Sequence, residues 1–326
     1  MEFSFASFPR DYQLLQLVAA GVGTATILST LLRFSRFTWS YFLRSSNLHV
    51  YLHTQQNEGG SWALITGASD GIGYAFVEEL LTKGFNVLLH GRNGEKLNRI
   101  QNELKARFPD RSIEIVVADA SAPGHPEDLV VAKAKTIPGK LTILINNVGG
   151  NATRPGCSPL ADFPREHVDT CINLNARFPL LLTRALIPVL ERSSPALIIN
   201  CGSGAARGIP YLATYSATKG FIHSFTTALR NEFTRSDAPG SVDVIGFVIG
   251  NVMSASNRIA LPAVTISAAQ CARGCLERVG CGEAVTCAHW KHASAMWFVS
   301  LLPESRINAL LMKATEERME LERKGE

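Results

Sequence analysis

Six short apolar runs alternate with longer segments of helical periodicity through most of this 326-residue chain. The runs are rich in Val, Ile and Leu, and each predicts a buried strand: residues 62–65, 87–90, 113–118, 141–145, 196–200 and 242–248. The segments between them predict helices, among them residues 74–83, 94–108, 164–191 and 215–235. Such alternation favours the α/β class with a doubly wound parallel sheet, which binds ligands beyond the carboxyl ends of its strands.

A glycine-rich turn follows the first predicted strand. Its glycines are spaced Gly67-x-x-x-Gly71-x-Gly73, and a predicted helix begins directly afterwards. Glycines allow a tight turn and close backbone approach, while the free N–H groups and the dipole at a helix start favour an anion. The segment therefore predicts a phosphate-binding turn, although a glycine-rich turn taken singly is as often an ordinary loop.

Tyr215 and Lys219 are four residues apart on the last long predicted helix, so they share a face. A nearby ammonium favours the phenolate form of a tyrosine, which suits the pair to general acid–base work at a carbonyl or alcohol. The same spacing is common by chance and usually belongs to a solvated helix face.

Taken in order, these motifs resemble the short-chain dehydrogenases/reductases, and the resemblance covers residues 62–254. It rests on Thr66-Gly67-x-x-x-Gly71-x-Gly73, on Asn146-Asn147-Val148-Gly149, on Asn173-Leu174 followed by Phe178, and on Ser203, which lies 12 residues before Tyr215. Val148 replaces the alanine of the family's Asn-Asn-Ala-Gly segment. The resemblance implies a Rossmann-type fold and an oxidoreductase that interconverts a ketone and a secondary alcohol.

The resemblance also implies a catalytic set of Asn173, Ser203, Tyr215 and Lys219. Nicotinamide delivers hydride to a carbonyl carbon, Tyr215 would protonate the developing alkoxide, and Ser203 would donate a hydrogen bond to its oxygen. Lys219 would bond the nicotinamide ribose, and Asn173 would hold a water that links Lys219 to solvent. From its surroundings alone, Ser203 is a turn serine between glycines and Asn173 a buried or helix-bending amide.

The end of the second predicted strand bears on the choice of cofactor. A carboxylate there would bond the ribose 2′-hydroxyl of NAD, whereas an arginine suits the 2′-phosphate of NADP. Arg92 stands there without a carboxylate, which predicts NADP(H), with a solvated loop arginine as the alternative. The full set of expected cofactor residues is Thr66, Gly67, Ser69, Asp70, Gly71, Ile72, Gly73, Arg92, Asp119, Asn146, Tyr215, Lys219 and Val252.

One branch of the family is favoured by three details: Asp70 in the turn, the Tyr-Ser-Ala-Thr-Lys form of the catalytic motif, and an apolar N-terminal extension. They resemble the membrane-bound very-long-chain 3-oxoacyl-CoA reductase and 17β-hydroxysteroid dehydrogenase group. The substrate would then be hydrophobic: a 3-oxoacyl thioester, a sterol ketone or a secondary-metabolite ketone. A homodimer is compatible with the resemblance. The rival function is a non-catalytic, cofactor-binding scaffold of the same fold, which would have no chemical need for an intact catalytic set.

Residues 12–32 contain no charged side chain and are just long enough to cross a hydrocarbon core of about 30 Å. We expect residues 1–60 to form a membrane anchor and a polar linker (53–60), and residues 61–326 a catalytic domain whose substrate loop spans about 251–287. A cleaved signal peptide and an amphipathic surface helix are the alternatives. Arg33, Arg36 and Arg44 follow the apolar segment while Arg10 alone precedes it, which predicts a cytosolic catalytic domain. The resemblance adds the endoplasmic reticulum as the membrane.

Composition excludes several classes of protein. The net charge of +4 is small for this length and argues against a nucleic-acid binder. The odd count of seven cysteines fits a reducing compartment, and the spacing of Cys271, Cys275, Cys281 and Cys287 matches no common zinc template, so we expect no metal.

Two departures from the family are Ile249-Gly250 in place of Pro-Gly and Ser254 in place of a threonine. Asn151 begins a glycosylation acceptor triplet that a cytosolic domain would leave unused.

Overall fold

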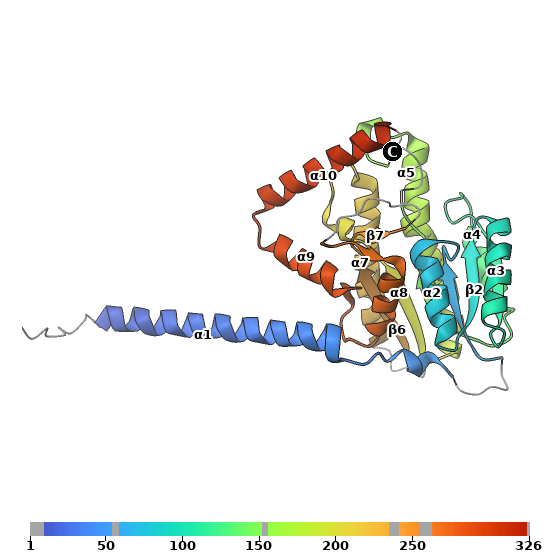
Figure 1. Ribbon diagram of the computed structural model, residues 1–326, viewed down its shortest axis with the longest axis horizontal. Coiled ribbons are helices and arrows are strands. Elements are labelled where there is room, and N and C mark those ends of the chain that lie inside the picture. Colours follow the sequence, from blue (N-terminus) through green and yellow to red (C-terminus); the bar gives the residue numbers. More distant parts are fainter. Residues whose placement is uncertain (1–9, 54–58, 152–155, 235–240, 255–262, 325–326) are drawn as a thin grey trace, which may run out of the picture. The chain divides into compact units, whose positions relative to one another are not determined.

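The computed structural model describes residues 10–53, 59–151, 156–234, 241–254 and 263–324. The chain divides into two compact units, Met1–Ser45 and Ser46–Glu326. Figure 1 gives the labels of the helices and strands that are used below.

The first unit is one helix. α1 (Arg10–Thr38) continues into a π-helical turn at Trp39–Leu43, so it runs well past the expected end at residue 32. Among the described residues, the apolar stretch Tyr12–Leu43 is the one candidate membrane span, with a mean hydropathy of 1.7. Large apolar side chains such as Phe34, Trp39 and Phe42 continue beyond Arg33, which explains the greater length. By length and composition α1 could cross a bilayer.

The second unit is built on a seven-stranded parallel sheet in the order β3-β2-β1-β4-β5-β6-β9. Its strands are β1 (Ser61–Thr66), β2 (Asn86–Gly91), β3 (Ile113–Val117), β4 (Lys140–Asn146), β5 (Ala196–Cys201), β6 (Val242–Val248) and β9 (Val285–Cys287). The chain winds outward from β1 in one direction and then from β4 in the other, which confirms the doubly wound sheet. All six expected strands are present. β9 was not expected, because three residues are too few for a pattern.

Helices cover both faces of the sheet (Figure 1) and enclose two apolar cores. On one face lie α2 (Gly71–Thr82), α3 (Gly94–Arg107) and α8 (Ala268–Glu277). On the other lie α4 (Pro126–Ala134), α6 (Phe178–Arg192) and α7 (Ala213–Thr234). β1 and β2 are buried along their whole length, as strands between two helical layers must be.

The long helix expected at residues 164–191 is interrupted. α5 (Arg165–Ile172) and α6 are separated by a π-helical turn at Asn173–Arg177. Pro179 has no N–H to donate to the carbonyl of Asn175, so the α-helical bond between them cannot form. The Asn175 side chain donates to the carbonyl of Cys171 at 3.0 Å, which opens the helix at a point where π turns often mark functional sites.

The second unit begins earlier than the boundary expected at residue 61. Ser46 donates to the carbonyl of Leu276 at 2.5 Å, and Leu48 and Tyr51 in a short 3-10 helix (Leu48–Tyr51) are buried in the core. Most of the linker expected at 53–60 lies outside the described residues. The unit ends with α9 (Trp290–Ser300) and α10 (Glu304–Lys324), and a minor sheet pairs β7 (Val252–Met253) with β8 (Ile266–Ser267).

Candidate active site

The glycine turn joins β1 to α2 at the carboxyl edge of the sheet. Gly67 and Gly71 adopt positive φ angles of 65° and 51°, which side chains disfavour. A Cβ on Gly73 would lie 2.1 Å from the carbonyl oxygen of Gly67, so only glycine fits there. Asp70 caps α2 by accepting from the N–H of Gly71 at 2.7 Å. Ser69 and Ile72 lie beside it, half-buried.

Thr66, the last residue of β1, and Asn147, which follows the neighbouring strand β4, hold this turn in place. The Thr66 hydroxyl accepts from the N–H groups of Asn147 (2.9 Å) and Val148 (3.0 Å). The Asn147 amide donates to the Thr66 carbonyl at 2.9 Å. The Asn-Asn-Val-Gly segment after β4 therefore fixes the shape of the glycine turn after β1.

Asn146, which we expected to bind cofactor, has a different place. It is 4% exposed, and its amide donates to the hydroxyl of Thr183 (2.9 Å) and to Asn200 (2.8 Å). Asn200 donates in turn to Thr226 at 2.9 Å. Asn146 thus belongs to a buried chain of hydrogen bonds that ties β4 and β5 to α6 and α7, because parallel strands bring their last residues together.

Two cations and two carboxylates lie near the end of β2. Arg92 is exposed, and its charge lies near the Asp119 carboxylate that follows β3. Partial burial opposes ionisation of Asp119, but hydrogen bonds from Ser121 outweigh it and lower its pKa, with Arg92 contributing. Lys96 pairs with Asp70 at 2.7 Å and lowers the pKa of that carboxyl. Sequence reasoning missed Lys96, because the ion pair closes only after folding.

His90 precedes this cluster on β2 and is buried. Its ring stacks on Phe178 at 5.2 Å between centroids, and Nε2 lies 3.1 Å from the carbonyl of Ala118. Burial lowers the pKa of His90 to about 4, so the ring is neutral near pH 7.

Tyr215 and Lys219 lie on one face of α7, as the spacing predicts. The Lys219 ammonium is 5.6 Å from the centre of the Tyr215 ring. Lys219 is 5% exposed, and its Nζ donates to the carbonyl of Cys201, the last residue of β5, at 3.2 Å. The strand end therefore holds the ammonium beside the phenol.

The asparagine beside this pair is Asn175, and not Asn173 as we expected. The Asn175 amide donates to the carbonyl of Gly150 and accepts from its N–H, both at 2.9 Å. A Cβ on Gly149 would lie 2.7 Å from Oδ1 of Asn175 and 3.0 Å from Nζ of Lys219, so both side chains abut one glycine. Asn173 is half-buried at the start of the π turn. Asn173 and Asn175 differ by half a helical turn, and the motif alone did not separate them.

Ser203 stands at the same edge of the sheet. The N–H groups of Gly202 and Gly204 donate to the carbonyls of Phe247 (2.8 Å) and Ile249 (3.0 Å), which extends β5 beside β6 as far as Ser203. The Ser203 hydroxyl accepts from the N–H of Ala205 at 3.1 Å and caps a short 3-10 helix (Gly204–Arg207).

His292 of α9 holds the loop that follows β6, a contact that the sequence did not reveal. It is 2% exposed; Nδ1 accepts from the N–H of Gly250 at 3.1 Å, and Nε2 lies 3.2 Å from the carbonyl of Asn251. A Cβ on Gly71 would lie 3.2 Å from Cβ of Ser254, so this loop packs on the glycine turn. Val252, an expected cofactor residue, is buried in β7 between these contacts.

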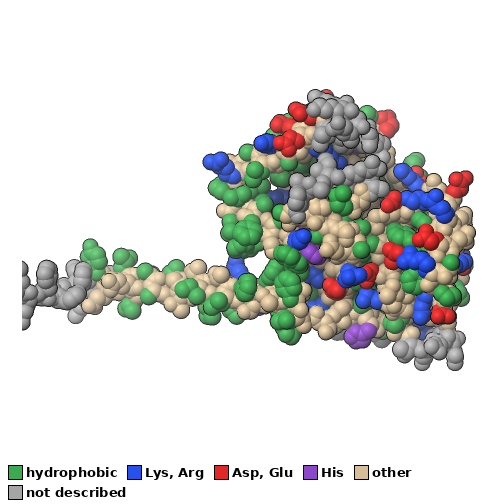
Figure 2. Space-filling view, viewed as in Figure 1, with side chains coloured by type: hydrophobic (Ala, Val, Ile, Leu, Met, Phe, Trp, Pro, Cys, Tyr) green, Lys and Arg blue, Asp and Glu red, His purple; other side chains and the backbone are tan. Residues whose placement is uncertain are grey.

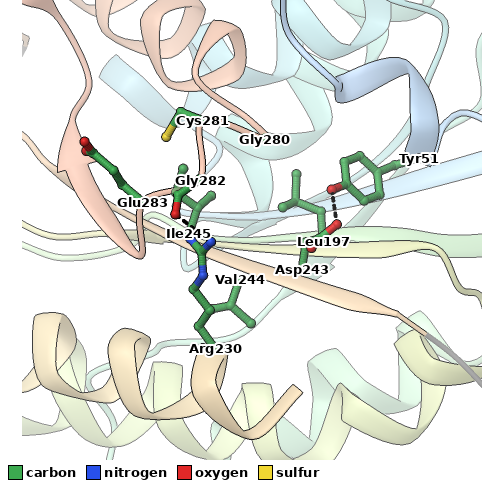
Figure 3. A pocket seen from close by; sticks show the side chains of 10 residues that line it. All are labelled: Tyr51, Leu197, Arg230, Asp243, Val244, Ile245, Gly280, Cys281, Gly282 and Glu283. Carbon is green, nitrogen blue, oxygen red and sulfur yellow. Dashed lines mark hydrogen bonds between the residues drawn. The ribbon is translucent and has the colours of Figure 1, made fainter. Parts of the chain in front are cut away.

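Figure 3 shows a small pocket elsewhere in the unit. It is lined by Leu197 and Asp243, each near the amino end of its strand, whereas the residues above follow the carboxyl ends. Within the pocket, the Tyr51 hydroxyl donates to the Asp243 carboxylate at 2.5 Å. Burial, and to a lesser degree the Asp243 carboxylate, raise the pKa of Tyr51. The pocket is thus separate from the catalytic edge.

The described residues contain no group of three His, Cys, Asp or Glu side chains placed to hold a metal ion. All seven cysteines are free thiols. Cys201, Cys271 and Cys275 lie together in the core, and burial raises the pKa of Cys201 and Cys275.

Comparison with known proteins places this architecture. The family model for short chain dehydrogenase matches residues 61–260. The very-long-chain 3-oxoacyl-CoA reductase of Pyricularia oryzae is 30% identical over 295 residues, covering 88% of this chain and 85% of that protein. A solved 7beta-hydroxysteroid dehydrogenase superposes with a TM-score of 0.68 at 22% identity over 78% of this chain and 98% of its own.

A 3-ketoacyl-(acyl-carrier-protein) reductase from Brucella melitensis, complexed with NADH, superposes with a TM-score of 0.60 at 25% identity, over 70% of this chain and 95% of its own. The Rossmann-type fold of the catalytic unit agrees with these matches. The chain belongs to the short chain dehydrogenase/reductase family and is a Rossmann-type oxidoreductase.

Proposed function

We propose that this chain is an NADP(H)-dependent reductase of a ketone on a hydrophobic acyl substrate, with a 3-oxoacyl thioester as the first candidate. The observation that carries the proposal is the gathering of Tyr215, Lys219 and Asn175 beside the glycine turn, at the edge where such sheets bind ligands. A scaffold that only bound cofactor would not require a proton donor held against a buried cation.

The turn has the form that a dinucleotide needs. Gly73 approaches the carbonyl of Gly67 too closely for any side chain, so the first turn of α2 can meet a pyrophosphate with backbone N–H groups. Thr66 and Asn147 hold that shape rigidly. When bound, the nicotinamide supplies the hydride.

Tyr215 would donate the proton to the oxygen of the reduced carbonyl. Lys219 would place its positive charge beside the oxygen left on Tyr215, because the buried ammonium lies 5.6 Å from the centre of that ring. Asn175 lies across Gly149 from Lys219, so it would help to set the position of the ammonium. The water-holding role expected for Asn173 would then fall to Asn175. The Ser203 hydroxyl accepts from the N–H of Ala205, and its hydrogen would be donated to the carbonyl oxygen of the substrate.

The preference for NADP(H) rests on charge at the end of β2. Arg92 directly follows β2 and Lys96 lies in the first turn of α3, where a 2′-phosphate would lie. Asp119 would lie toward the adenine, its charge held by Ser121 and Arg92.

The substrate class and location follow from the relatives and from α1. The Pyricularia protein is named for 3-oxoacyl-CoA reduction, and its match extends over 88% of this chain, beyond the family domain. A long acyl chain partitions into lipid, and α1 is long and apolar enough to anchor the enzyme there. We place the anchor in the endoplasmic reticulum, with the catalytic unit in the cytosol.

The test is NADPH oxidation by the purified full-length enzyme against a panel of 3-oxoacyl-CoA, steroid and polyketide ketones. Tyr215→Phe should keep NADPH binding and lose turnover by about a hundredfold or more, because only the proton donor is removed. Tyr74→Phe, which removes a hydroxyl bonded to Glu103 on the surface, is the control and should keep full activity. A folded Tyr215→Phe enzyme with normal turnover would refute the mechanism, and an enzyme that prefers a steroid would refute the substrate class alone.

A further inference from the structure

A projecting apolar tip is formed by the end of α9, the turn after it and the start of α10. Residues 293–303 carry no charged side chain. Trp297, Phe298 and Leu301 are 52%, 62% and 61% exposed, and Leu302 is 40% exposed. Figure 2 shows hydrophobic side chains gathered over this part of the catalytic unit. We refer to these four side chains as the apolar tip.

The tip stands clear of the cores because little of it packs inward. His292 anchors the start of α9, and Ile307 and Thr315 are the buried residues of α10 in the part that the structure describes. Between these anchors, every residue from 300 to 306 is exposed or nearly so. Four large apolar side chains on such a projection cost free energy in water unless another surface covers them.

From this arrangement we propose that the tip inserts into the interfacial layer of a lipid bilayer, as a second membrane contact separate from α1. The inference rests on the proposed anchoring by α1. The uncharged run is too short to span a membrane, but it suits a segment that lies at the headgroup boundary. Tryptophan favours that boundary. Lys291 precedes the run, and Arg306 follows it after Glu304, so each end carries a cation that would face anionic headgroups.

The bilayer is a better occupant than a second copy of the chain. A fully buried aromatic side chain contributes about 150–250 Å², so four partly exposed side chains offer roughly 400 Å². A stable protein interface buries about 800 Å² on each partner. The tip falls short of that area, and its shape is a projection rather than a flat face.

The attachment to α1 supplies a bilayer at close range. The helical part of the first unit ends at Leu43, and Ser46 is already hydrogen-bonded within the second unit. If α1 spans the membrane, the catalytic unit is held at its surface by two intervening residues, and the tip meets lipid at high effective concentration.

Tryptophan quenching in proteoliposomes of the full-length enzyme tests the proposal. The vesicles contain phosphatidylcholine and phosphatidylserine with bromine on the acyl chains. Trp297→Phe should remove a component that bromolipid quenches and iodide does not. Trp290→Phe, two turns earlier on α9, is the matched control and should leave that bromolipid component unchanged.

Three results overturn the proposal. Quenching of the Trp297 component by iodide places the tip in water. Quenching by neither agent, together with a cross-linked dimer, places it against a second copy. An unchanged bromolipid component in Trp297→Phe places Trp297 outside the bilayer.

A carbonate wash of the same vesicles separates this failure from failure of the anchor. Trp297→Ser/Phe298→Ser should remain in the pellet, because α1 still holds it, and should keep its activity on a short water-soluble ketone. Release of the wild-type chain by carbonate would remove the anchor itself.

Discussion

Lys219 is a nearly buried cation, so the groups around it must hold its charge and fix its position. The carbonyl of Cys201 accepts a hydrogen bond from its Nζ, and the Asn175 side chain lies across Gly149 from that Nζ. Asn175 itself is locked by three hydrogen bonds to the carbonyls of Gly150 and Cys171 and the N–H of Gly150. The position of Lys219 beside Tyr215 therefore depends on the side-chain amide of Asn175.

Asn175→Ala should therefore lower kcat by at least about tenfold, because the backbone of Gly150 and the position of Lys219 both lose their support. Asn173→Ala should stay within about twofold of wild type. The measurement is kcat and its pH profile for both variants at a temperature where each is folded by circular dichroism. If the two substitutions lower kcat equally, Asn175 has no special part in positioning Lys219.

Arg92→Ala should raise KM for NADPH about tenfold or more and leave KM for NADH nearly unchanged, because only NADPH carries the 2′-phosphate that a charge-assisted bond of about 1.5–3 kcal/mol would hold. Steady-state kinetics with both cofactors checks this. Arg99→Ala, on α3 and seven residues after Arg92, is the charge-matched control. Equal weakening toward both cofactors would make Arg92 a structural residue.

At the scale of elements, α9 controls a loop of the active edge from outside it. His292 bonds the N–H of Gly250 and the carbonyl of Asn251, and the same loop packs Ser254 on Gly71. This places a single imidazole between the C-terminal helices and the cofactor turn. Ile249-Gly250 has no proline to fix the backbone, so the two hydrogen bonds of His292 restrain this part of the loop.

His292→Leu should raise KM for NADPH by about tenfold through loss of two hydrogen bonds, whereas His292→Gln, which can both donate and accept, should restore most of it. A purely structural role would lower the melting temperature of both variants without this split in KM.

The hydrogen bonds of His292 to Gly250 and Asn251 should weaken in acid. Burial lowers the pKa of His292, so the neutral ring is favoured in the folded enzyme. Its contribution is complete above the unfolded value of about 6.5 and is lost as the pH falls through the lower folded value. The charge of Lys291 also favours the neutral ring, while hydrogen bonds to the backbone of Asn251 and Val264 oppose the shift. KM for NADPH in wild type should rise over that range, and in His292→Gln it should rise less.

At the scale of the whole molecule, one apolar helix and one catalytic unit share a chain with a short connection. Arg33 and Arg36 lie in the last third of the candidate span Tyr12–Leu43 and Arg44 follows it, and basic residues stay on the cytoplasmic side. Full-length protein in microsomes should pellet after an alkaline carbonate wash, and protease added outside should digest the catalytic unit. Protection from protease, or glycosylation at Asn151, would reverse the topology.

The sequence by itself determined the class of fold and the chemistry. Apolar runs such as that at β1 predict buried strands, because a strand between two helical layers must be apolar throughout. Tyr215 and Lys219 are close in sequence and share a helix face, so their meeting needs no tertiary information. The glycines of the turn are similarly local, since the backbone angles that require them arise within a few residues.

Only the tertiary structure decided the contacts that close over long separations. Contacts with Gly150 and Lys219 distinguish Asn175 from Asn173. The hydrogen bond from Asn146 to Asn200 lies in the core, and His292 bonds to Gly250, which is 42 residues away in the sequence. β9 forms because β6 offers it an edge, and the apolar tip is exposed because α9 and α10 are anchored elsewhere. Sequence patterns record which side chains avoid water, but which partners they meet depends on how the elements pack.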